Sequence, residues 1–404
     1  MKCRSCESNN LKLILDLGLQ PWGNDFQSIT TTSDLKKYPL ELYFCLDCSL
    51  AQIGYTVPKE VMFVNHKYMS GTTETLTNHF NNISKKLIKK YNLILTDLIL
   101  DIGGNDGTYL EYFHRNGYRT LNIDSGEVQS TISKAKSIPT INDFFSTNLV
   151  LKILGDFGMA KVIHASGVLF HLENLHDVFQ GIKLFLADDG ILVAEFIYLP
   201  KMIENLAYDQ IYHEHLMYYT LFSLQKLLKK FDLEIFDCNL YPIHGGTCVA
   251  YISHRNSKQK TKRFTFYWNE EVNKGFCGSQ PLQKFAEEVR KSSFQLRRLI
   301  EDKVNSGSKI YAIGAPVKGS TLINFASLNE ILIPFAIETN RLKFETFLPG
   351  TKIRVIEEGS IGHPDVYLLL AWNFKDEIIS KFKDFFSSGG KMIIPIPYPT
   401  EVTY

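Results

Sequence analysis

Two Cys-x-x-Cys pairs constrain the fold of this chain more than any other feature of its sequence. "CRSC" contains Cys3 and Cys6, and "CLDC" contains Cys45 and Cys48. Each pair directs two thiolates at one centre, so two pairs supply the four sulfur ligands of a closed tetrahedral zinc site. The gap between the pairs is roughly twice that of the usual zinc-ribbon pattern, which requires a sizeable loop between them. We predict a structural zinc site, and a redox dithiol is less favoured because the pairs are doubled.

Composition and charge exclude several classes of protein. At 404 residues the chain is long enough for two or three domains, and 45% hydrophobic residues predict folding throughout. Its 44 basic and 43 acidic residues give a net charge of +1, so we expect no nucleic-acid or membrane partner. No apolar run is long enough to span a bilayer, and "MKCRSCESNN" lacks the apolar core of a secretion signal. We therefore expect a cytoplasmic protein with reduced thiols, in which Cys238, Cys248 and Cys277 are buried apolar side chains.

A glycine turn in the middle of the chain predicts a nucleoside-binding site. In "DLILDIGGNDGTYLEYF" a buried strand ends in a turn with Gly103, Gly104 and Gly107 and continues as a helix, and "RTLNIDSG" is a second strand that ends at Asp124. Such a turn directs backbone N–H groups and a helix N-terminus at a ligand, while the later acid is placed to bind a ribose diol. The glycine order departs from the Gly-x-Gly-x-x-Gly dinucleotide fingerprint, and Asp101-x-Gly103 resembles the first motif of S-adenosylmethionine-dependent methyltransferases. A turn without any ligand is the alternative.

Further candidate residues follow the next strands of this α/β region. "TINDFF" places Asp143 beside Phe144, a carboxylate and a ring suited to the amino group and the face of an adenine. "KVIHASGVLFHLENL" brings a loop to the same carboxyl edge of the sheet, where open α/β folds bind ligands. "GILVAEFIYL" is a further strand, and it leads into "YDQIYHEHLMYY", residues 208–219. This titratable cluster is therefore predicted to lie at the ligand edge of the sheet.

Three interpretations of "YHEH" are open at this point: a metal site, an acid–base centre and an ordinary polar turn. His213 and His215 are two residues apart, so they share a face in a strand but not in a helix. A metal would also need a further ligand from elsewhere in the chain. A neutral imidazole, in contrast, can accept and return a proton near neutral pH.

The last part of the chain repeats the plan of strand, turn and helix. A helical run from about residue 280 to residue 304 precedes "KIYAIGAPVKGSTLINF", and "LIPFAIE", "PDVYLLLAW" and "KMIIPIP" continue the strands. Gly314, Lys318, Gly319 and Ser320 stand where a lysine and a helix N-terminus are suited to bind a diphosphate. A purely structural helix cap is the alternative for this turn.

Taken together, these motifs resemble the sugar C-methyltransferases that build branched-chain deoxysugars. The resemblance runs from the N-terminal cysteines to "GGKMIIPIPYP" and includes "DIGGNDGTYL", "IYHEHLMYY", "YPIHGGTCVAYI", "FLPGTKI" and "LLLAWNF". It implies an α/β protein with a zinc-binding N-terminal domain (1–65), a class I methyltransferase core with a Rossmann-like fold (66–300) and a second Rossmann-like domain on the substrate side (301–404). It also implies methylation at C3 of a nucleotide-linked 4-keto-deoxysugar, with S-adenosylmethionine as cofactor and zinc as structural metal.

The same resemblance assigns roles to individual residues. His215 is the expected general base, which removes the proton next to the ketone, and the other expected catalytic residues are Glu214, Tyr212, Tyr68 and His171. The expected cofactor-binding residues are Asp101, Gly103, Asn105, Asp106, Gly107, Asp124, Asp143 and Phe144. The expected substrate-binding residues are His244, Lys318, Ser320 and Arg341. The expected zinc ligands are Cys3, Cys6, Cys45 and Cys48.

Two other functions fit parts of the sequence. A nicotinamide-dependent oxidoreductase of a nucleotide sugar would use the glycine turn and Asp124, but the departure from the dinucleotide fingerprint disfavours it. A zinc-ribbon nucleic-acid methyltransferase would need a basic, aromatic-rich face, which the near-zero net charge disfavours. Within the C-methyltransferase pattern, Ser166 and Gly167 stand where an Asn-Val type pair is expected. Asp101 and Gly104 likewise stand where Glu and Ser are more familiar.

Overall fold

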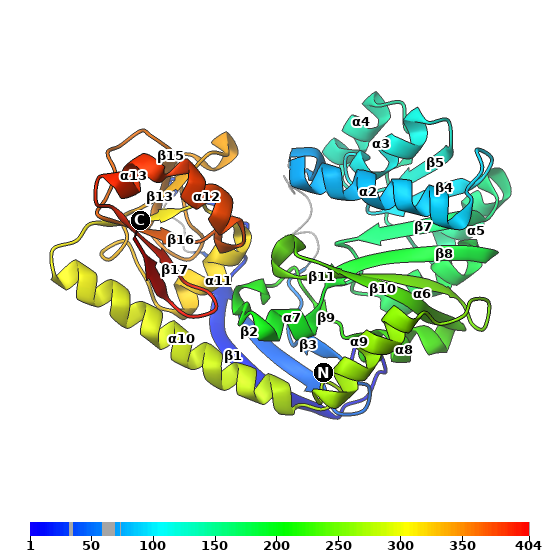
Figure 1. The fold of residues 1–404 in the computed structure, drawn as a ribbon, viewed down its shortest axis with the longest axis horizontal. Coiled ribbons are helices and arrows are strands. Elements are labelled where there is room, and N and C mark those ends of the chain that lie inside the picture. The colour runs from blue at the N-terminus through cyan, green and yellow to red at the C-terminus, as the bar shows by residue number, and fades with distance from the viewer. Residues whose placement is uncertain (32–34, 59–68, 73, 404) are drawn as a thin grey trace.

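Three β-sheets organise the described part of the chain. The computed structural model describes residues 1–404 except 32–34, 59–68, 73 and 404. One sheet has four strands and each of the other two has seven. Figure 1 shows the two larger sheets on opposite sides of the molecule, with the long helix α10 (Gln280–Asn305) running along the lower side from one to the other.

The four-stranded sheet joins the N-terminus of the chain to a strand from far downstream. Its order is β1-β2-β3-β9, and all neighbours are antiparallel. Ala51 pairs with Tyr218 and Gln52 with Met217, so β9 completes the sheet that the first three strands begin. The strands are β1 (Leu11–Pro21), β2 (Lys37–Cys45), β3 (Ala51–Ile53) and β9 (Met217–Tyr218).

The sheet of the middle region has the order β10-β11-β8-β7-β4-β5-β6. Its strands from β6 to β8 are parallel, β11 is antiparallel to β8, and β10 is antiparallel to β11. The bounds are β4 (Leu98–Ile102), β5 (Arg119–Ile123), β6 (Thr140–Ile141), β7 (Ala160–Ser166), β8 (Leu186–Ile197), β10 (Leu233–Tyr241) and β11 (Thr247–His254). This is the Rossmann-like methyltransferase fold that the sequence predicts. Strand order reverses at β4, between β5 and β7, and a ligand site is expected in the crevice at that point.

Helices cover both faces of this sheet, which explains why β4 is buried along its length. Ile99 and Val162 pack with α2 and α3 on one face, whereas Leu100 and Ile163 belong to the core that includes α5 and α6. Successive residues of a strand point to opposite faces, so a strand buried on both sides has no polar face. The helices of this region are α2 (Glu74–Tyr91), α3 (Thr108–Arg115), α4 (Glu127–Ala135), α5 (Thr147–Phe157), α6 (Leu175–Phe185), α7 (Leu199–Glu204), α8 (Leu221–Leu228) and α9 (Lys262–Asn273).

The third sheet repeats the central order of the second. Its order is β14-β15-β13-β12-β16-β17-β18, and the five strands from β15 to β17 are parallel. The predicted second Rossmann-like region is therefore present. Its strands are β12 (Ile310–Ile313), β13 (Phe335–Glu338), β14 (Thr346–Phe347), β15 (Arg354–Glu357), β16 (Val366–Leu369), β17 (Lys391–Ile394) and β18 (Thr400–Val402). Its helices are α11 (Val317–Phe325), α12 (Lys375–Lys381) and α13 (Lys383–Ser387).

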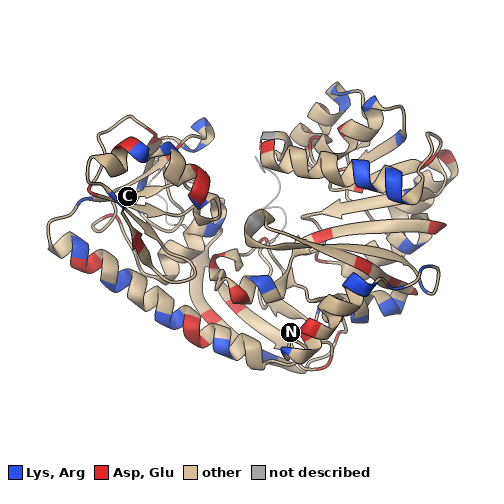
Figure 2. Cartoon of the chain, in the orientation of Figure 1, with Lys and Arg blue, Asp and Glu red and all other residues tan. Residues whose placement is uncertain are grey.

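The predicted helical run near residues 280–304 is α10, and its apolar side chains explain its position. Leu282, Phe285, Val289, Leu296 and Ile300 recur at helical spacing and are buried. Lys, Arg, Asp and Glu are interspersed along the same helix, as Figure 2 shows, in keeping with the near-zero net charge of the chain. No helix in the described part of the chain combines the length and the apolar character needed to cross a membrane.

The cysteines outside the two pairs differ from one another in burial. Cys238 and Cys248 are fully buried, as predicted, on the adjacent strands β10 and β11. Cys277 is only partly buried, so the prediction of a buried apolar side chain was wrong at that position. Cys277 lies in the connection between α9 and α10, where its backbone carbonyl accepts a hydrogen bond from Ser49 Oγ at 2.6 Å.

Candidate functional site

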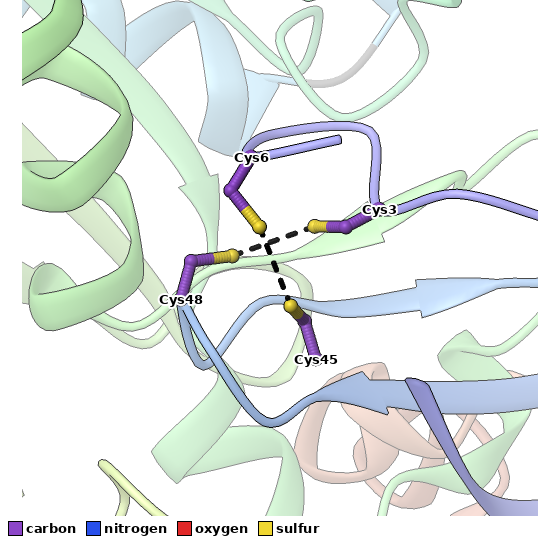
Figure 3. A group of neighbouring side chains, drawn as sticks. All are labelled: Cys3, Cys6, Cys45 and Cys48. Atoms are coloured by element: carbon purple, nitrogen blue, oxygen red, sulfur yellow. Dashed lines mark hydrogen bonds between the residues drawn. The ribbon is translucent and has the colours of Figure 1, made fainter. Parts of the chain in front are cut away.

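The four cysteines of the two pairs lie together and fit a zinc ion. Figure 3 shows their sulfur atoms converging from the N-terminal loop and from the turn between β2 and β3. Cys3 and Cys48 Sγ are 3.4 Å apart, Cys6 and Cys45 Sγ are 3.5 Å apart, and all four sulfurs lie within 4.8 Å of one another. A tetrahedral ion with Zn–S bonds of about 2.3 Å would separate its sulfurs by about 3.8 Å. These are therefore the ligands of a closed, structural centre.

The cysteine centre is connected directly to the middle region of the chain. The backbone carbonyl of Ser5 accepts hydrogen bonds from His176 Nε2 and Lys230 Nζ, both at 2.8 Å. Strand β3, which follows the Cys45–Cys48 turn, pairs with β9, and Ile53 N donates to Leu216 O at 3.0 Å. The metal therefore stabilises a sheet whose last strand directly follows the "YHEH" sequence.

Replacing Cys45 by Ser should release zinc and destabilise the four-stranded sheet. Because a structural zinc site contributes its binding free energy to folding, we expect the melting temperature to fall by roughly 10 °C or more. Elemental analysis and thermal melting of the purified protein measure the two effects. Cys277→Ser, which changes a thiol outside the centre, is the matched control. Unchanged melting together with no bound zinc in the parent protein would contradict the assignment.

The residues between α7 and α8 form a buried segment, residues 208–219, which we call the histidine segment. It begins with a single 3-10 turn (Tyr208–Gln210), continues through a turn in which His215 N donates to Tyr212 O, and ends in β9. Leu216 N donates to Phe170 O at 2.8 Å, which ties the segment to the loop after β7. The predicted cluster therefore lies at the carboxyl edge of the middle sheet.

The hydrogen bond of His215 to Gln210 defines the tautomer of the neutral ring. Its Nδ1 lies 2.8 Å from the backbone oxygen of Gln210, and only the ring can supply the proton of that hydrogen bond. In the neutral ring the lone pair is therefore on Nε2. The side chain is 4% exposed, and its ring centroid lies 3.9 Å from that of Tyr212 and 4.8 Å from that of Phe170.

His171 lies beside His215 and is held by the histidine segment. It occupies the turn after β7, its Nδ1 donates to the backbone oxygen of Glu214, and its ring centroid lies 5.2 Å from that of His215. The structure thus brings together Tyr212, Glu214, His215 and His171, four of the five predicted catalytic residues. The fifth, Tyr68, lies outside the described residues.

His213 contacts the N-terminal region of the chain, unlike His215. Its Nε2 donates to Pro39 O at 3.2 Å, and its ring meets the edge of Tyr38 at a centroid distance of 5.7 Å. Burial lowers the pKa of His213. The described residues contain one group of possible metal ligands, the four cysteines, so the metal interpretation of "YHEH" has no support there.

Stability should fall below about pH 6.5 in part because of His213. The folded pKa lies below the ordinary value of 6.5, so the unfolded chain takes up the proton first and the stabilisation is lost as the pH falls. His213→Gln keeps a donor for Pro39 O but cannot titrate. Urea unfolding at pH 5.5 and pH 7.5 should show a smaller pH effect for the variant than for the parent protein. Equal pH effects would contradict this account.

Glu214 is bound by two residues that the sequence did not single out. Trp22 Nε1 and Asn24 Nδ2 both donate to Glu214 Oε1, each at 2.8 Å. Both donors belong to "QPWGNDF", which sequence reasoning treated only as part of a loop between the cysteine pairs. No local pattern could connect residues that lie about 190 positions apart in the chain.

Asp209, at the other end of the histidine segment, is bound by the third sheet. Trp372 Nε1 donates to Asp209 Oδ2 at 2.6 Å, and Lys318 Nζ lies 3.6 Å from the same oxygen and 4.4 Å from the centroid of the Trp372 ring. Burial raises the pKa of Asp209, and the Lys318 charge opposes that rise. Lys318 Nζ also donates to Asn373 Oδ1 at 2.6 Å. The predicted phosphate ligand Lys318 therefore faces the histidine segment.

The other predicted substrate residues are spread over the third sheet and its neighbourhood. Ser320 is buried in α11 and donates to Pro349 O at 3.2 Å, whereas Arg341 is exposed. The side chain of His244 lies outside the described residues. The assignment of these three residues stays a prediction.

The glycine turn after β4 has the hydrogen bonds of a preformed binding loop. Gly103 has a φ of 62°, and its N–H donates to Ile123 O at 2.7 Å. Asp124, after β5, accepts from Asn105 N at 2.8 Å and from Gly126 N at 2.7 Å, which fixes its carboxylate at the predicted ribose position. The rigid turn and an oriented carboxylate fit a nucleoside cofactor.

The segment before α2 covers the same turn. Ser70 N donates to Asn105 Oδ1 and Gly71 N to Asp106 Oδ2, both at 3.0 Å. A Cβ on Gly71 would stand 2.7 Å from Asp106 Oδ2, so only glycine allows this approach. Asp106 is thus engaged by protein groups, as is Thr108, whose Oγ1 donates to Asp106 Oδ1 at 2.6 Å.

The remaining predicted cofactor residues differ in exposure. Asp101 is buried below the turn, and its Oδ1 lies 2.7 Å from Nδ1 of His164. Asp143 and Phe144 follow β6 and are exposed, Phe144 by 49%. Gly107 begins α3 with a φ of 76°. The exposed ring of Phe144 suits the face of an adenine, whereas Asp101 supports the turn from inside.

Three protein families match successive parts of the chain. A putative zinc-binding domain matches residues 3–63, a methyltransferase domain matches residues 77–237, and a C-methyltransferase C-terminal domain matches residues 242–397. The first match contains the four cysteines, and the second contains the glycine turn and the histidine segment. Fold and matches together define a methyltransferase.

The chain is similar along its whole length to a curated enzyme. It is 28% identical over 406 residues to C-methyltransferase NovU of Streptomyces niveus. The alignment covers 100% of this chain and 97% of NovU. Among solved structures, an S-adenosylmethionine-dependent methyltransferase of Clostridium acetobutylicum is 12% identical, with a TM-score of 0.36. The match covers 49% of this chain and 96% of the Clostridium chain. Magnesium protoporphyrin IX methyltransferase of Synechocystis PCC 6803 is 13% identical at a TM-score of 0.32, covering 44% of this chain and 79% of its own.

The family matches and the cysteine centre identify the chain as an S-adenosylmethionine-dependent C-methyltransferase with an N-terminal zinc-binding domain. This confirms the resemblance that the sequence motifs carry. Neither the three family matches nor NovU is a nicotinamide-dependent oxidoreductase.

Proposed function

We propose that this C-methyltransferase acts on C3 of a nucleotide-linked 4-keto-deoxysugar, with His215 as general base. The observation that carries the proposal is the Nδ1 hydrogen bond of His215 to Gln210 O, which leaves the lone pair of the neutral ring on Nε2. Similarity to NovU along the whole chain supports the same class of reaction. The sugar, its position and the base are our inference from this geometry and the motif resemblance.

The chemistry of such a substrate requires the groups that surround His215. A carbon next to a ketone becomes nucleophilic only after a base removes its proton, and the enolate oxygen then needs hydrogen-bond donors. S-adenosylmethionine, when bound, supplies the electrophilic methyl group. His215 Nε2 would take the C3 proton. The enolate carbon would then attack, and the electron pair of the broken C–H bond would become the new C–C bond. The bond between the methyl carbon and sulfur would break, and its electron pair would stay on the sulfur of the S-adenosylhomocysteine that leaves.

The tautomers decide which neighbour can stabilise the enolate. His171 uses its Nδ1 proton for Glu214 O, so it can donate from Nε2 only as a cationic imidazolium. A tyrosine hydroxyl donates while neutral, and the Tyr212 ring lies 3.9 Å from that of His215. We therefore assign the enolate oxygen to Tyr212, with Tyr68 as the second predicted tyrosine, and a cationic His171 as an electrostatic partner.

The three parts of the chain have separate tasks in this proposal. Residues 1–65 bind zinc and support the histidine segment, residues 66–300 bind the cofactor, and residues 301–404 bind the nucleotide of the substrate. Asp124, Phe144 and the glycine turn would hold the cofactor's ribose, adenine and amino-acid portions. The zinc centre needs thiolates that only a reducing compartment maintains, which supports a cytoplasmic location.

Titration with S-adenosylhomocysteine tests the class of cofactor. We expect micromolar binding of S-adenosylhomocysteine by calorimetry and none of NADH or NADPH, because Asp124 is fixed at the ribose position while the dinucleotide fingerprint is missing. Nicotinamide binding without S-adenosylhomocysteine binding would overturn the proposal.

Replacing His215 by Ala tests the base. Loss of a general base should lower turnover by roughly 10²- to 10⁴-fold, while affinity for S-adenosylhomocysteine stays within a few-fold. Solvent deuterium exchange at substrate C3, followed by mass spectrometry without methyl donor, should disappear as well. His254→Ala is the matched control. His254 lies at the end of β11 opposite to Thr247, the residue that pairs with Ile197 of β8. Near-normal exchange in His215→Ala would assign the base elsewhere, with His171 the next candidate.

A further inference from the structure

The contact between the zinc-binding region and Glu214 extends the active site beyond the methyltransferase core. We propose that Trp22 and Asn24 are positioning residues for methyl transfer, which act by fixing the carboxylate of Glu214, the residue that precedes His215 in the chain. This inference rests on the proposed function, because it takes the His215 site as the reaction centre. It gives the zinc-binding region a part in catalysis in addition to its part in stability.

The two hydrogen bonds define the orientation of the Glu214 side chain. An indole N–H and a carboxamide N–H are donors, so Glu214 Oε1 accepts twice, at 2.8 Å from each nitrogen. Glu214 is 5% exposed, so these two donors contact a buried carboxyl group. Glu214 Oε1 thus accepts hydrogen bonds from two directions. These two contacts fix the orientation of the carboxylate.

Glu214 transmits this orientation to both histidines of the site. Its backbone oxygen accepts the proton of His171 Nδ1, and His215 is its neighbour in the chain. The backbone on either side is fixed as well, since His215 N donates to Tyr212 O and Leu216 N to Phe170 O. A change in the Glu214 side chain therefore acts on residues that the proposed reaction uses.

The loop that carries the two donors is itself fixed from the opposite side. Gly23, between Trp22 and Asn24, is packed so closely that a Cβ would stand 2.7 Å from Val317 Cγ1 and 3.1 Å from Val317 O, at the start of α11. A Cβ on Gly350 would likewise meet Pro21 Cγ at 2.8 Å. The sequence Trp-Gly-Asn thus fits between the histidine segment and the third sheet.

Glu214 differs in its partners from Asp209, the other hydrogen-bonded carboxylate of the histidine segment. Asp209 is paired with Lys318 at 3.6 Å, whereas Glu214 forms no ion pair with the residues that the structure describes. Neutral donors orient a carboxylate without cancelling its charge.

Indole NMR tests the contact without any substrate. The chain has three tryptophans, and with ¹⁵N-labelled indoles each gives one N–H resonance, assigned through Trp22→Phe, Trp268→Phe and Trp372→Phe. Glu214→Gln should shift the Trp22 resonance and leave that of Trp372 in place. Asp209→Asn should do the reverse, because Trp372 donates to Asp209. An unmoved Trp22 resonance in Glu214→Gln would overturn the proposal.

A double-mutant cycle tests the positioning role. Trp22→Phe and Asn24→Ala should each lower turnover on the order of tenfold by removing a hydrogen bond to a charged group. Zinc content and S-adenosylhomocysteine affinity should remain those of the parent. In a Glu214→Ala background neither change should lower turnover further, since all act through one carboxylate. Trp268→Phe, whose ring packs on Phe222 and Phe264, should keep full turnover.

The outcomes distinguish this proposal from the proposed function. If Trp22→Phe or Asn24→Ala lowered turnover further in the Glu214→Ala background, these residues would not act through Glu214. That result would overturn the positioning role and leave the proposed methyl transfer untouched. A parent protein that methylates none of the keto-sugar nucleotides would overturn the proposed function, whatever the indole resonances show.

Discussion

The pairing of β3 with β9 is the contact on which the rest of the structure depends. It joins the sheet that carries the cysteine centre to the strand that directly follows His215, through the register Ala51 to Tyr218 and Gln52 to Met217. Backbone hydrogen bonds fix direction and spacing more strictly than side-chain packing does. The metal centre and the histidine segment therefore form one rigid unit, and the middle sheet and the third sheet are arranged around it.

Both Rossmann-like sheets stabilise their first turn in the same way. Asp124 after β5 accepts from Asn105 N in the turn after β4. Glu338, the last residue of β13, accepts from Ala315 N, at 2.9 Å, in the turn after β12. Each carboxylate also caps its own loop, Asp124 through Gly126 N and Glu338 through Asn340 N at 3.1 Å. The shared strand order thus comes with a shared polar contact.

Local patterns predicted what depends on neighbouring residues. The cysteine spacing gave the four ligands, the glycine turn gave the edge of the middle sheet, and the apolar spacing near residues 280–304 gave α10. The contacts of Glu214 with Trp22 and of Asp209 with Trp372 join residues far apart in the chain, so no spacing rule could indicate them. The same holds for Lys318, which sequence context assigned to a phosphate and which the fold turns toward a buried carboxylate.

The position of β9 in the chain also affects the order of folding during synthesis. The first three strands of the small sheet leave the ribosome long before residues 217 and 218, so β3 has an unpaired edge while strands β4 to β8 of the middle sheet are still being made. An open strand edge can pair with other chains, and contacts distant in sequence form late. Early zinc binding would hold the Cys45–Cys48 turn closed during that interval. The metal would then protect the nascent sheet before it supports the mature one.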